Sequence, residues 1–365
     1  MRLIAPLAKA IGVTRLADVT GLDRIGLPVF QAIRPRALSL SVSQGKGLSR
    51  DAARVSALVE AIELHHAERV TVDGYGAAFP DEGVLWARMS PASGQAAPFD
   101  PARPRGWITA TDLLGGGAVR VPHGLVSMDC TVPREADLWP NTNGLAAGND
   151  IVEAEVAALC EVIERDSQER WLAGSTAARR ATALDPTAID MRAGCWMFAR
   201  IARAGLRCTL WDMSDAHGVA TIGCAIIEPG PAATLALPPA FGAGCHPRRA
   251  VALVRAVAEA AQTRVALIAG SRDDLTDGDY ADPGGQRRRL ALATHDFGGP
   301  PARRWQDVPD HPLPTDEAER ACLLAACARA GGGVVARIDL TPPACPIAIV
   351  RLVVPGFGDH DRPPA

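Results

Sequence analysis

The longest segments of the chain carry hydrophobic residues at helical spacing. The pattern predicts helices over residues 50–70, 151–172 and 248–269, with a shorter one over 316–330. Ser49 and Asp150 stand just before the first two, where such side chains cap a helix. Glu153 is placed to complete a capping box after Asp150. Pro247 stands near the start of the third helix, where proline is tolerated.

Alternation of apolar and polar residues predicts a half-buried strand at 38–43, followed by a turn at Gln44–Gly47. Further strands are expected at residues 118–126, 207–213, 219–227, 334–340 and 346–354. Residues 72–105 are expected to form loops with short elements, and 271–315 an exposed excursion, because both are rich in glycine and proline. Strands interleave with helices, so the predicted fold class is α/β, with α+β as the alternative. We expect one domain with internal pseudo-symmetric strand–helix repeats.

Two of the long helices carry matching pairs of glutamates. Glu60 and Glu63 form one pair, and Glu161 and Glu164 repeat it 101 positions later (161 − 60 and 164 − 63). Residues three apart share a helix face, so each pair places two carboxylates side by side on an otherwise apolar helix. Buried carboxylates are unfavourable unless they are paired or bind a metal. The pattern predicts a site for hard divalent cations; the alternative is a solvated stripe on each helix.

Composition and charge exclude several classes of protein. The chain has 365 residues and a net charge of −3, which argues against a nucleic-acid or acidic-membrane partner. No apolar run approaches the roughly 18–20 residues of a membrane span, and the N-terminus lacks a signal-peptide layout. The nine cysteines are scattered without a C-x-x-C motif. This favours reduced thiols in the cytoplasm over a disulfide framework or a zinc site.

Cationic and amide side chains accompany the glutamates. Of 38 basic residues only Lys9 and Lys46 are lysines, and Lys46 lies between two glycines, which suggests a phosphate contact or a chance placement. The only asparagines, Asn141, Asn143 and Asn149, fall within nine positions. Carboxylates, cations and amides together are typical of a site that binds Mg²⁺ and a polyphosphate for phosphoryl transfer. No P-loop and no G-x-G-x-x-G opens a helix, so a nucleotide would bind in a non-standard fold.

Four groups of residues resemble the motifs of the YcaO superfamily, in the same order. They are Ser43–Leu48 with Ser56, Glu60 and Glu63; Asn143–Asn149 with Glu153 and Glu161–Arg165; Gly244–Pro247 with Glu259–Arg264 and Ala269–Asp274; and Asp339–Thr341 with Val353–Gly356. The resemblance divides the chain into an N-terminal extension (1–37), a YcaO domain (38–357) and a C-terminal tail (358–365).

This resemblance implies ATP-dependent activation of a peptide backbone amide in an unusual ATP-binding fold. A nucleophile adds to the amide carbon, the oxyanion is phosphorylated, and phosphate leaves. Cys, Ser or Thr side chains give azolines, sulfide gives a thioamide, and an amine gives an amidine. Carried over residue by residue, the resemblance implies that the Mg²⁺ ligands are Glu60, Glu63, Glu161 and Glu164. The implied phosphate contacts, which would carry the catalysis, are Lys46, Arg165 and Arg264. The further implied nucleotide or metal contacts are Ser43, Asn149, Glu153 and Gln262.

The sequence also departs from the family pattern. Leu64 follows Glu63 where the family usually has arginine, and Ala147 and Ala157 replace hydrogen-bonding residues. These departures favour a hypothesis of another class, in which the protein is a non-catalytic nucleotide-binding scaffold. The complete set of four glutamates argues against it. The tail 358–365 lacks the alternating prolines of azoline-forming members.

The chain looks most similar to the TfuA-associated branch of the family, which forms peptide thioamides. We therefore expect thioamide formation in a ribosomally made peptide or protein, as in natural-product biosynthesis, with azoline-forming cyclodehydration as the alternative. The expected partners are a precursor substrate, a TfuA-like protein and a sulfide donor. The 37 residues before the domain are too few for a peptide-binding module, so leader recognition is expected on another chain. The oligomeric state is left open, a homodimer being one option.

Overall fold

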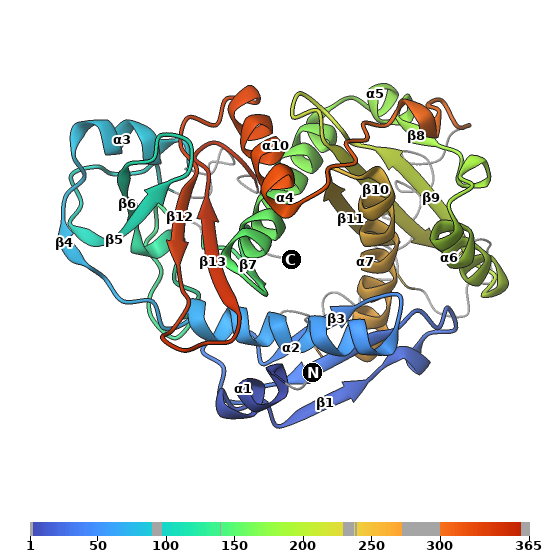
Figure 1. The fold of residues 1–365 in the computed structure, drawn as a ribbon, viewed down its shortest axis with the longest axis horizontal. Coiled ribbons are helices and arrows are strands. Elements are labelled where there is room, and N and C mark those ends of the chain that lie inside the picture. The colour runs from blue at the N-terminus through green and yellow to red at the C-terminus, as the bar shows by residue number, and fades with distance from the viewer. Residues whose placement is uncertain are drawn as a thin grey trace.

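The fold combines long helices with short strands (Figure 1). The computed structural model describes residues 3–89, 97–138, 140–228, 237, 239–271 and 300–358. The helices are α1 (Ile4–Ala10), α2 (Arg50–Ala67), α3 (Pro80–Ala87), α4 (Ile151–Ala173), α5 (Thr176–Arg180), α6 (Arg192–Arg203), α7 (Arg249–Ala269) and α10 (Asp316–Arg329). The strands are β1 (Arg15–Asp18), β2 (Val29–Ile33), β3 (Val42–Lys46), β4 (Gly74–Gly76), β5 (Arg105–Asp112), β6 (Ala118–Pro122), β7 (Leu145–Gly148), β8 (Ala183–Leu184), β9 (Arg207–Asp212), β10 (Ala220–Ile227), β11 (Ala240–His246), β12 (Ala336–Asp339) and β13 (Ala348–Val353).

These strands form three sheets. The first has the order β1-β2-β3 and the second the order β11-β10-β9-β8. The third has the order β4-β5-β12-β13-β7, and β6 also pairs with β5. Because the named strands pair antiparallel throughout the described residues, the α+β alternative describes this mixed fold. The strand pair predicted at 207–213 and 219–227 is confirmed as β9 and β10.

In three places a strand leads into a long helix and packs against it. The units are β3–α2, β7–α4 and β11–α7, and their helices lie around the middle of the molecule (Figure 1). Glycines bring strand and helix backbones together: a Cβ on Gly45 would lie 2.1 Å from the Ala57 nitrogen, and one on Gly242 2.2 Å from the Ala260 nitrogen. Any side chain at these positions would push the strand off its helix. The structure thus contains three strand–helix repeats.

The turn predicted at Gln44–Gly47 is wrong, because β3 continues to Lys46. The strand itself begins later than predicted, at Val42. Gly45 and Gly47 serve close packing against α2 and do not reverse the chain: a Cβ on Gly47 would lie 2.7 Å from the Ala52 Cβ. Glycine in a strand marks either a turn or a close backbone approach, and sequence alone did not separate the two.

Both predicted helix caps are confirmed. The Ser49 side chain accepts a hydrogen bond from the Ala52 N–H, and Asp150 accepts from the Val152 and Glu153 N–H groups. The predicted capping box is shifted by one residue, because the Glu153 carboxylate accepts from the Asn149 N–H instead of the Asp150 N–H. In α7 the N-cap is Arg248, so Pro247 precedes the helix.

Residues before the expected domain boundary at 38 belong to the same sheet as β3. β2 pairs with β3 along its length, and β1 pairs with β2. Residues 272–274 of the resemblance, most of the expected excursion and the tail after Gly358 lie outside the described residues. Within the described part of the chain, helices long and apolar enough to cross a membrane are absent.

An ion pair at the end of α2 is almost completely buried. Arg34 is 1% exposed and Glu68 3% exposed, and the two guanidinium nitrogens of Arg34 donate to the two carboxylate oxygens at 2.7 and 2.5 Å. Burial alone would raise the pKa of Glu68, but hydrogen bonds from Arg34 and Ser39 outweigh it and lower the pKa to about 2. The pair therefore stabilises the fold only while Glu68 is ionised.

We predict that Glu68→Gln lowers the free energy of unfolding at pH 7 by about 3–5 kcal/mol, because Arg34 is left buried without a counter-charge. The depressed pKa means that this stabilisation is present above pH 4.5 and is lost as pH falls towards 2. Urea unfolding at a series of pH values checks both statements. The exposed Asp51→Asn serves as control, and a difference from wild type that stays constant down to pH 2 would contradict the assignment.

Candidate functional site

The predicted glutamates of α2 and α4 lie close to one another. The second glutamate of each pair also accepts a hydrogen bond from the next strand–helix unit. Glu63 accepts a hydrogen bond from the Ala147 N–H of β7 at 2.6 Å. Glu164 accepts from the Cys245 N–H of β11 at 2.9 Å. Ala147 and Cys245 each lie three residues before the N-cap of their own unit (150 − 147 and 248 − 245). The same contact therefore links the first unit to the second and the second to the third.

The third unit carries an equivalent pair, Glu259 and Gln262, which the sequence analysis did not recognise as matching the other two. Glu60, Glu161 and Glu259 each lie eleven residues after a helix N-cap (60 − 49, 161 − 150 and 259 − 248). Gln262 then corresponds to Glu63 and Glu164. The third pair is harder to see in the sequence because one carboxylate is replaced by an amide and the offset is 98 positions (259 − 161). Counting from each cap would have found it.

Lys46 joins the first unit to the third, so the three units form a closed ring of contacts. Its Nζ lies 2.8 Å from the Glu259 carboxylate of α7. Burial would raise the pKa of Glu259, but Lys46 and Arg165 outweigh it and lower that pKa. Lys46 itself lies three residues before the Ser49 cap, the position held by Ala147 and Cys245 in the other units. The three units are thus joined in sequence, but the third contact differs: it uses a lysine side chain and Glu259, which corresponds to Glu60 and Glu161.

Negative charge is concentrated where these helices meet. We call the group the carboxylate cluster; its members are Glu60, Glu63, Glu161, Glu164 and Glu259. Burial and the neighbouring Glu60 and Glu161 carboxylates raise the pKa of Glu63 to about 8. Burial and Glu259 raise the pKa of Glu164 to about 7, despite the nearby cations Arg255 and Arg165. Carboxylates that resist ionisation at neutral pH lack sufficient positive charge around them. Their oxygens are the ligands that Mg²⁺ prefers, so the donor set and its surplus charge fit this ion.

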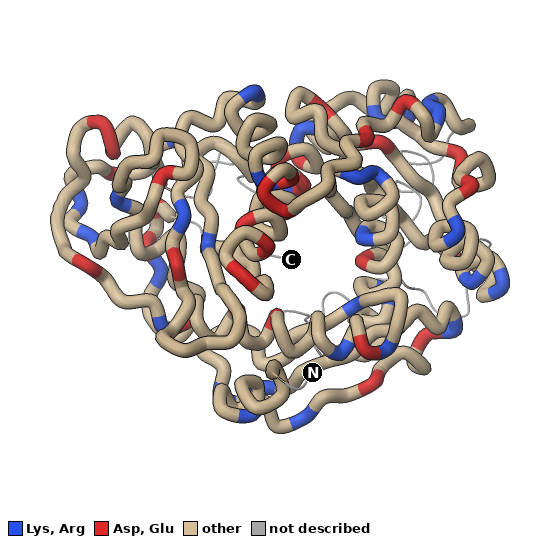
Figure 2. Tube along the Cα trace, in the orientation of Figure 1, with Lys and Arg blue, Asp and Glu red and all other residues tan. Residues whose placement is uncertain are grey.

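The remaining predicted residues are distributed around the cluster. Arg165 lies 3.9 Å from Glu161, one turn back on α4. Asn149 donates from Nδ2 to Glu153 at 2.7 Å at the start of α4. Ser43 is buried in β3, and Gln262 is half-buried on α7. Figure 2 shows acidic positions along α4 and on α7 facing the middle of the molecule, with basic positions beside them.

Arg264 is not brought to the carboxylate cluster by its contacts. Its Nε lies 3.1 Å from Asp23, and its terminal nitrogen lies 3.7 Å from Glu228. The side chain is 1% exposed and joins α7 to the segment before β2. The phosphate contact expected for Arg264 would require it to exchange these two carboxylates for phosphate oxygens.

Arg255 and Arg351 belong to the cluster, although the sequence analysis did not single them out. Arg255 on α7 lies close enough to Glu164 and Glu161 for these carboxylates to raise its pKa, against the opposing effect of burial. Arg351 on β13 is buried. Burial lowers its pKa, and the Glu161 carboxylate opposes this shift. Neither belongs to a repeated motif, and arginine is common in this chain, so sequence alone gave no reason to choose them.

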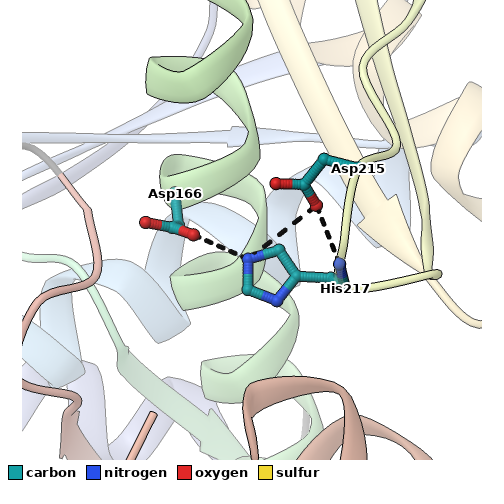
Figure 3. Close-up of side chains that lie close together, drawn as sticks. All are labelled: Asp166, Asp215 and His217. Carbon is teal, nitrogen blue, oxygen red and sulfur yellow. Dashed lines mark hydrogen bonds and ion pairs between the residues drawn. The ribbon is translucent and has the colours of Figure 1, made fainter. Parts of the chain in front are cut away.

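A second polar cluster lies further along α4 (Figure 3). His217 Nε2 lies 2.7 Å from Asp166 and 3.9 Å from Asp215, a grouping close enough to hold a metal ion. However, the Arg170 Nε also lies 2.7 Å from Asp166 and supplies the positive charge that a metal would bring. The Gly358 N–H donates to the other oxygen of Asp166 at 3.4 Å. We interpret the cluster as a structural contact that joins the β9–β10 loop and the last described residue to α4.

The family model described as YcaO cyclodehydratase, ATP- and Mg²⁺-binding, matches residues 44–358. Among curated proteins, the chain is 33% identical over 369 residues to an uncharacterized protein in the tfuA 3′ region of Rhizobium leguminosarum bv. trifolii. That match covers 97% of this chain and 86% of the relative.

Two solved structures share the fold. YcaO from Methanopyrus kandleri, bound with AMPPCP and Mg²⁺, has a TM-score of 0.73 at 24% identity, covering 99% of this chain and 92% of that one. A heterocyclase in complex with substrate and cofactor has a TM-score of 0.77 at 19% identity over 97% of this chain. The match spans about half of that longer protein, 52% of its chain.

We predict that Glu161→Gln weakens Mg²⁺-dependent ATP binding at least tenfold, or about 1.4 kcal/mol, because it removes one of the proposed metal ligands. Melting temperature should stay near wild type, since the change also relieves repulsion among carboxylates. Calorimetric titration of ATP with and without Mg²⁺ measures the effect. Glu317→Gln, at an exposed position on α10, is the matched control. Equal ATP affinity in both variants would remove Glu161 from the site.

We also predict that Lys46→Ala lowers ATP turnover by more than any loss of stability explains. Lys46→Arg should restore it only in part, because a planar guanidinium replaces a compact ammonium group. Glu259→Gln separates two explanations, since it removes the partner of Lys46 and keeps the lysine. Turnover measured at saturating Mg²⁺ should be affected less by Glu259→Gln than by Lys46→Ala. Full activity in Lys46→Arg would show that lysine is not required.

Proposed function

The chain belongs to the YcaO family, and on that basis we propose that it activates a peptide backbone amide by ATP-dependent phosphorylation of the amide oxygen. The observation that carries the proposal is the ring of carboxylates joined across α2, α4 and α7, bordered by cations. Such a ring suits a ligand that brings both metal ions and phosphates. The proposed YcaO domain spans residues 38–357.

The site residues take the roles that the resemblance implies. The proposed Mg²⁺ ligands are Glu60, Glu63, Glu161 and Glu164. Lys46 and Arg165 are proposed to contact phosphate, while Ser43, Asn149, Glu153 and Gln262 contribute to the nucleotide or metal site. When bound, Mg²⁺ neutralises charge on the phosphates. The departure at Ala147 leaves the contact to Glu63 intact, because the donor is the backbone N–H.

We propose thioamide formation as the reaction. Hydrosulfide adds to the amide carbon, and the π electrons of the carbonyl move to its oxygen. That oxyanion attacks the γ-phosphorus of ATP, the bond between this phosphorus and the bridging oxygen breaks, and ADP leaves. Phosphate then departs with the former amide oxygen, the sulfur loses its proton, and C=S forms. Amide, hydrosulfide and ATP thus give thioamide, ADP and hydrogen phosphate.

The genomic context of a relative supports thioamide formation. The Rhizobium leguminosarum relative is described by its place in a tfuA region, and we propose that this chain works with a TfuA-like partner that helps to deliver sulfur from a sulfide donor. The substrate would be a precursor peptide or protein. Azoline formation from Cys, Ser or Thr is the second candidate, favoured by the description of the matching family model as a cyclodehydratase.

Intact-mass analysis of a precursor peptide separates the two reactions. The peptide is incubated with this protein, a TfuA-like partner, ATP, Mg²⁺ and sulfide. We predict a mass gain equal to the replacement of one oxygen by sulfur, on a residue without a nucleophilic side chain. Omission of sulfide, and separately of ATP, provides the controls. Loss of one water confined to Cys, Ser or Thr would reject thioamidation and establish azoline formation.

A further inference from the structure

Four arginines are buried in the described part of the chain, and one of them differs from the others. Arg34, Arg105 and Arg264 form ion pairs with Glu68, Asp137 and Asp23 at 2.5, 2.7 and 3.1 Å, respectively. Arg351 is 4% exposed and forms no ion pair with a described carboxylate. A buried guanidinium without a counter-charge is unfavourable unless a ligand supplies one.

Only one nitrogen of Arg351 is occupied. Its NH2 donates to the Leu125 carbonyl at 3.3 Å and to the Asn141 Oδ1 at 3.2 Å. The Nε and NH1 groups are buried and have no hydrogen-bond partner among the described residues. Such unpaired donors weaken the fold by about 1–3 kcal/mol each. Glu161 is the acidic group that acts on this guanidinium, so the vacant donors belong to the neighbourhood of the carboxylate cluster.

An unpaired acceptor belongs to a residue that shares a hydrogen-bond partner with Arg351. The Oδ1 of Asn143 is buried without a hydrogen-bond partner in the described structure. Asn143 also donates its backbone N–H to the Asn141 Oδ1 at 3.0 Å, so that one oxygen joins Asn143 to Arg351. Across the sheet, Arg351 is the register partner of Leu145, two residues after Asn143. The space beside Gly358 is filled by the same residue: a Cβ on Gly358 would lie 2.3 Å from the Asn143 Nδ2 and 3.6 Å from the Arg165 Cβ.

We propose that Arg351 and Asn143 form the subsite that holds the reacting backbone amide, Arg351 donating to the amide oxygen and Asn143 accepting from the amide N–H. A peptide bond offers a carbonyl oxygen with two lone pairs and one N–H, which matches the two unpaired donors and the one unpaired acceptor. The ionised phosphates of Mg²⁺-bound ATP offer only acceptors and would leave the Asn143 oxygen without a partner. The inference rests on the proposed function and adds to it the residues that recognise the bond to be modified.

Arg351 would then stabilise the charge that develops during the reaction. When the nucleophile adds, the amide oxygen becomes an oxyanion, and a fixed guanidinium in a buried site interacts with it more strongly than with the neutral carbonyl. The carboxylate Glu161 nearby belongs to the proposed metal site, so the oxyanion would form close to the phosphoryl group it attacks. Donors of this kind contribute about 10²–10³-fold to turnover.

The test compares Arg351→Lys, Arg351→Met and Asn143→Ala in the full chain with Mg²⁺, ATP and a modifiable peptide. We expect both Arg351 variants to lower kcat for peptide modification by roughly 100–1000-fold. Their calorimetric affinity for ATP should change by less than about threefold, or 0.7 kcal/mol. Asn143→Ala should raise the KM for peptide more than it lowers kcat. Arg337→Lys, on the neighbouring strand β12 and paired with Glu155, is the control and should retain turnover.

Each outcome decides between explanations. A parallel loss of ATP affinity and kcat would make Arg351 a phosphate contact and overturn the inference. Wild-type kcat in Arg351→Lys or Arg351→Met would also overturn it while leaving the proposed function intact. If wild type binds ATP but modifies no amide, the proposed function fails and the subsite fails with it. Melting curves report folding, and Arg351→Lys retains the buried charge should Arg351→Met unfold.

Discussion

The structure depends on a polar contact that each helix of the ring makes to the next unit. Glu63 and Glu164 accept hydrogen bonds from the backbones of β7 and β11, and Lys46 of β3 reaches Glu259 of α7. Two of these contacts occur at equivalent positions and the third is an ion pair, so a polar contact joins each of the three units to the next. A carboxylate held by a backbone N–H keeps a fixed orientation, and its second oxygen remains available for a ligand. The contact that fixes the architecture therefore also prepares the site.

Such an arrangement stores unfavourable electrostatic energy. Several carboxylates lie together in half-buried or buried positions, and burial together with their mutual repulsion raises the pKa values of Glu63 and Glu164. The fold tolerates this because glycine-mediated packing of each strand on its helix holds the units together independently of the charges. The buried pair of Arg34 and Glu68 adds a further anchor at the end of α2, away from the unmatched carboxylates. Binding of cations would relieve the repulsion that folding creates.

Much of this could be predicted from the sequence, and the failures have physical reasons. Helix periodicity and the Ser49 and Asp150 caps are local features, so the helices of these segments were predicted correctly. The Gln44–Gly47 segment was misread because a glycine signal does not say whether the chain turns or packs closely. Strand β5 was missed: it begins at Arg105, the last residue of the expected loop segment, and continues where no element was predicted. Arg351 could not be found, because its significance is that two of its buried nitrogens have no partner among the described residues, which only the three-dimensional structure reveals.

The charges around the ring also restrict what can occupy it. The carboxylates of three helices favour a ligand with positive charge. The same region also contains cations from separate elements, namely Lys46, Arg165, Arg255 and Arg351. A metal ion alone would leave these cations repelled, and a polyphosphate alone would be repelled by the carboxylates. A ligand that combines both charges satisfies the two sets together, as a nucleotide with its divalent cations does. The uncharged amide of Asn143 is linked to Arg351 through the Asn141 oxygen. In the proposed subsite this neutral acceptor would favour a peptide bond over the charged ligand beside it.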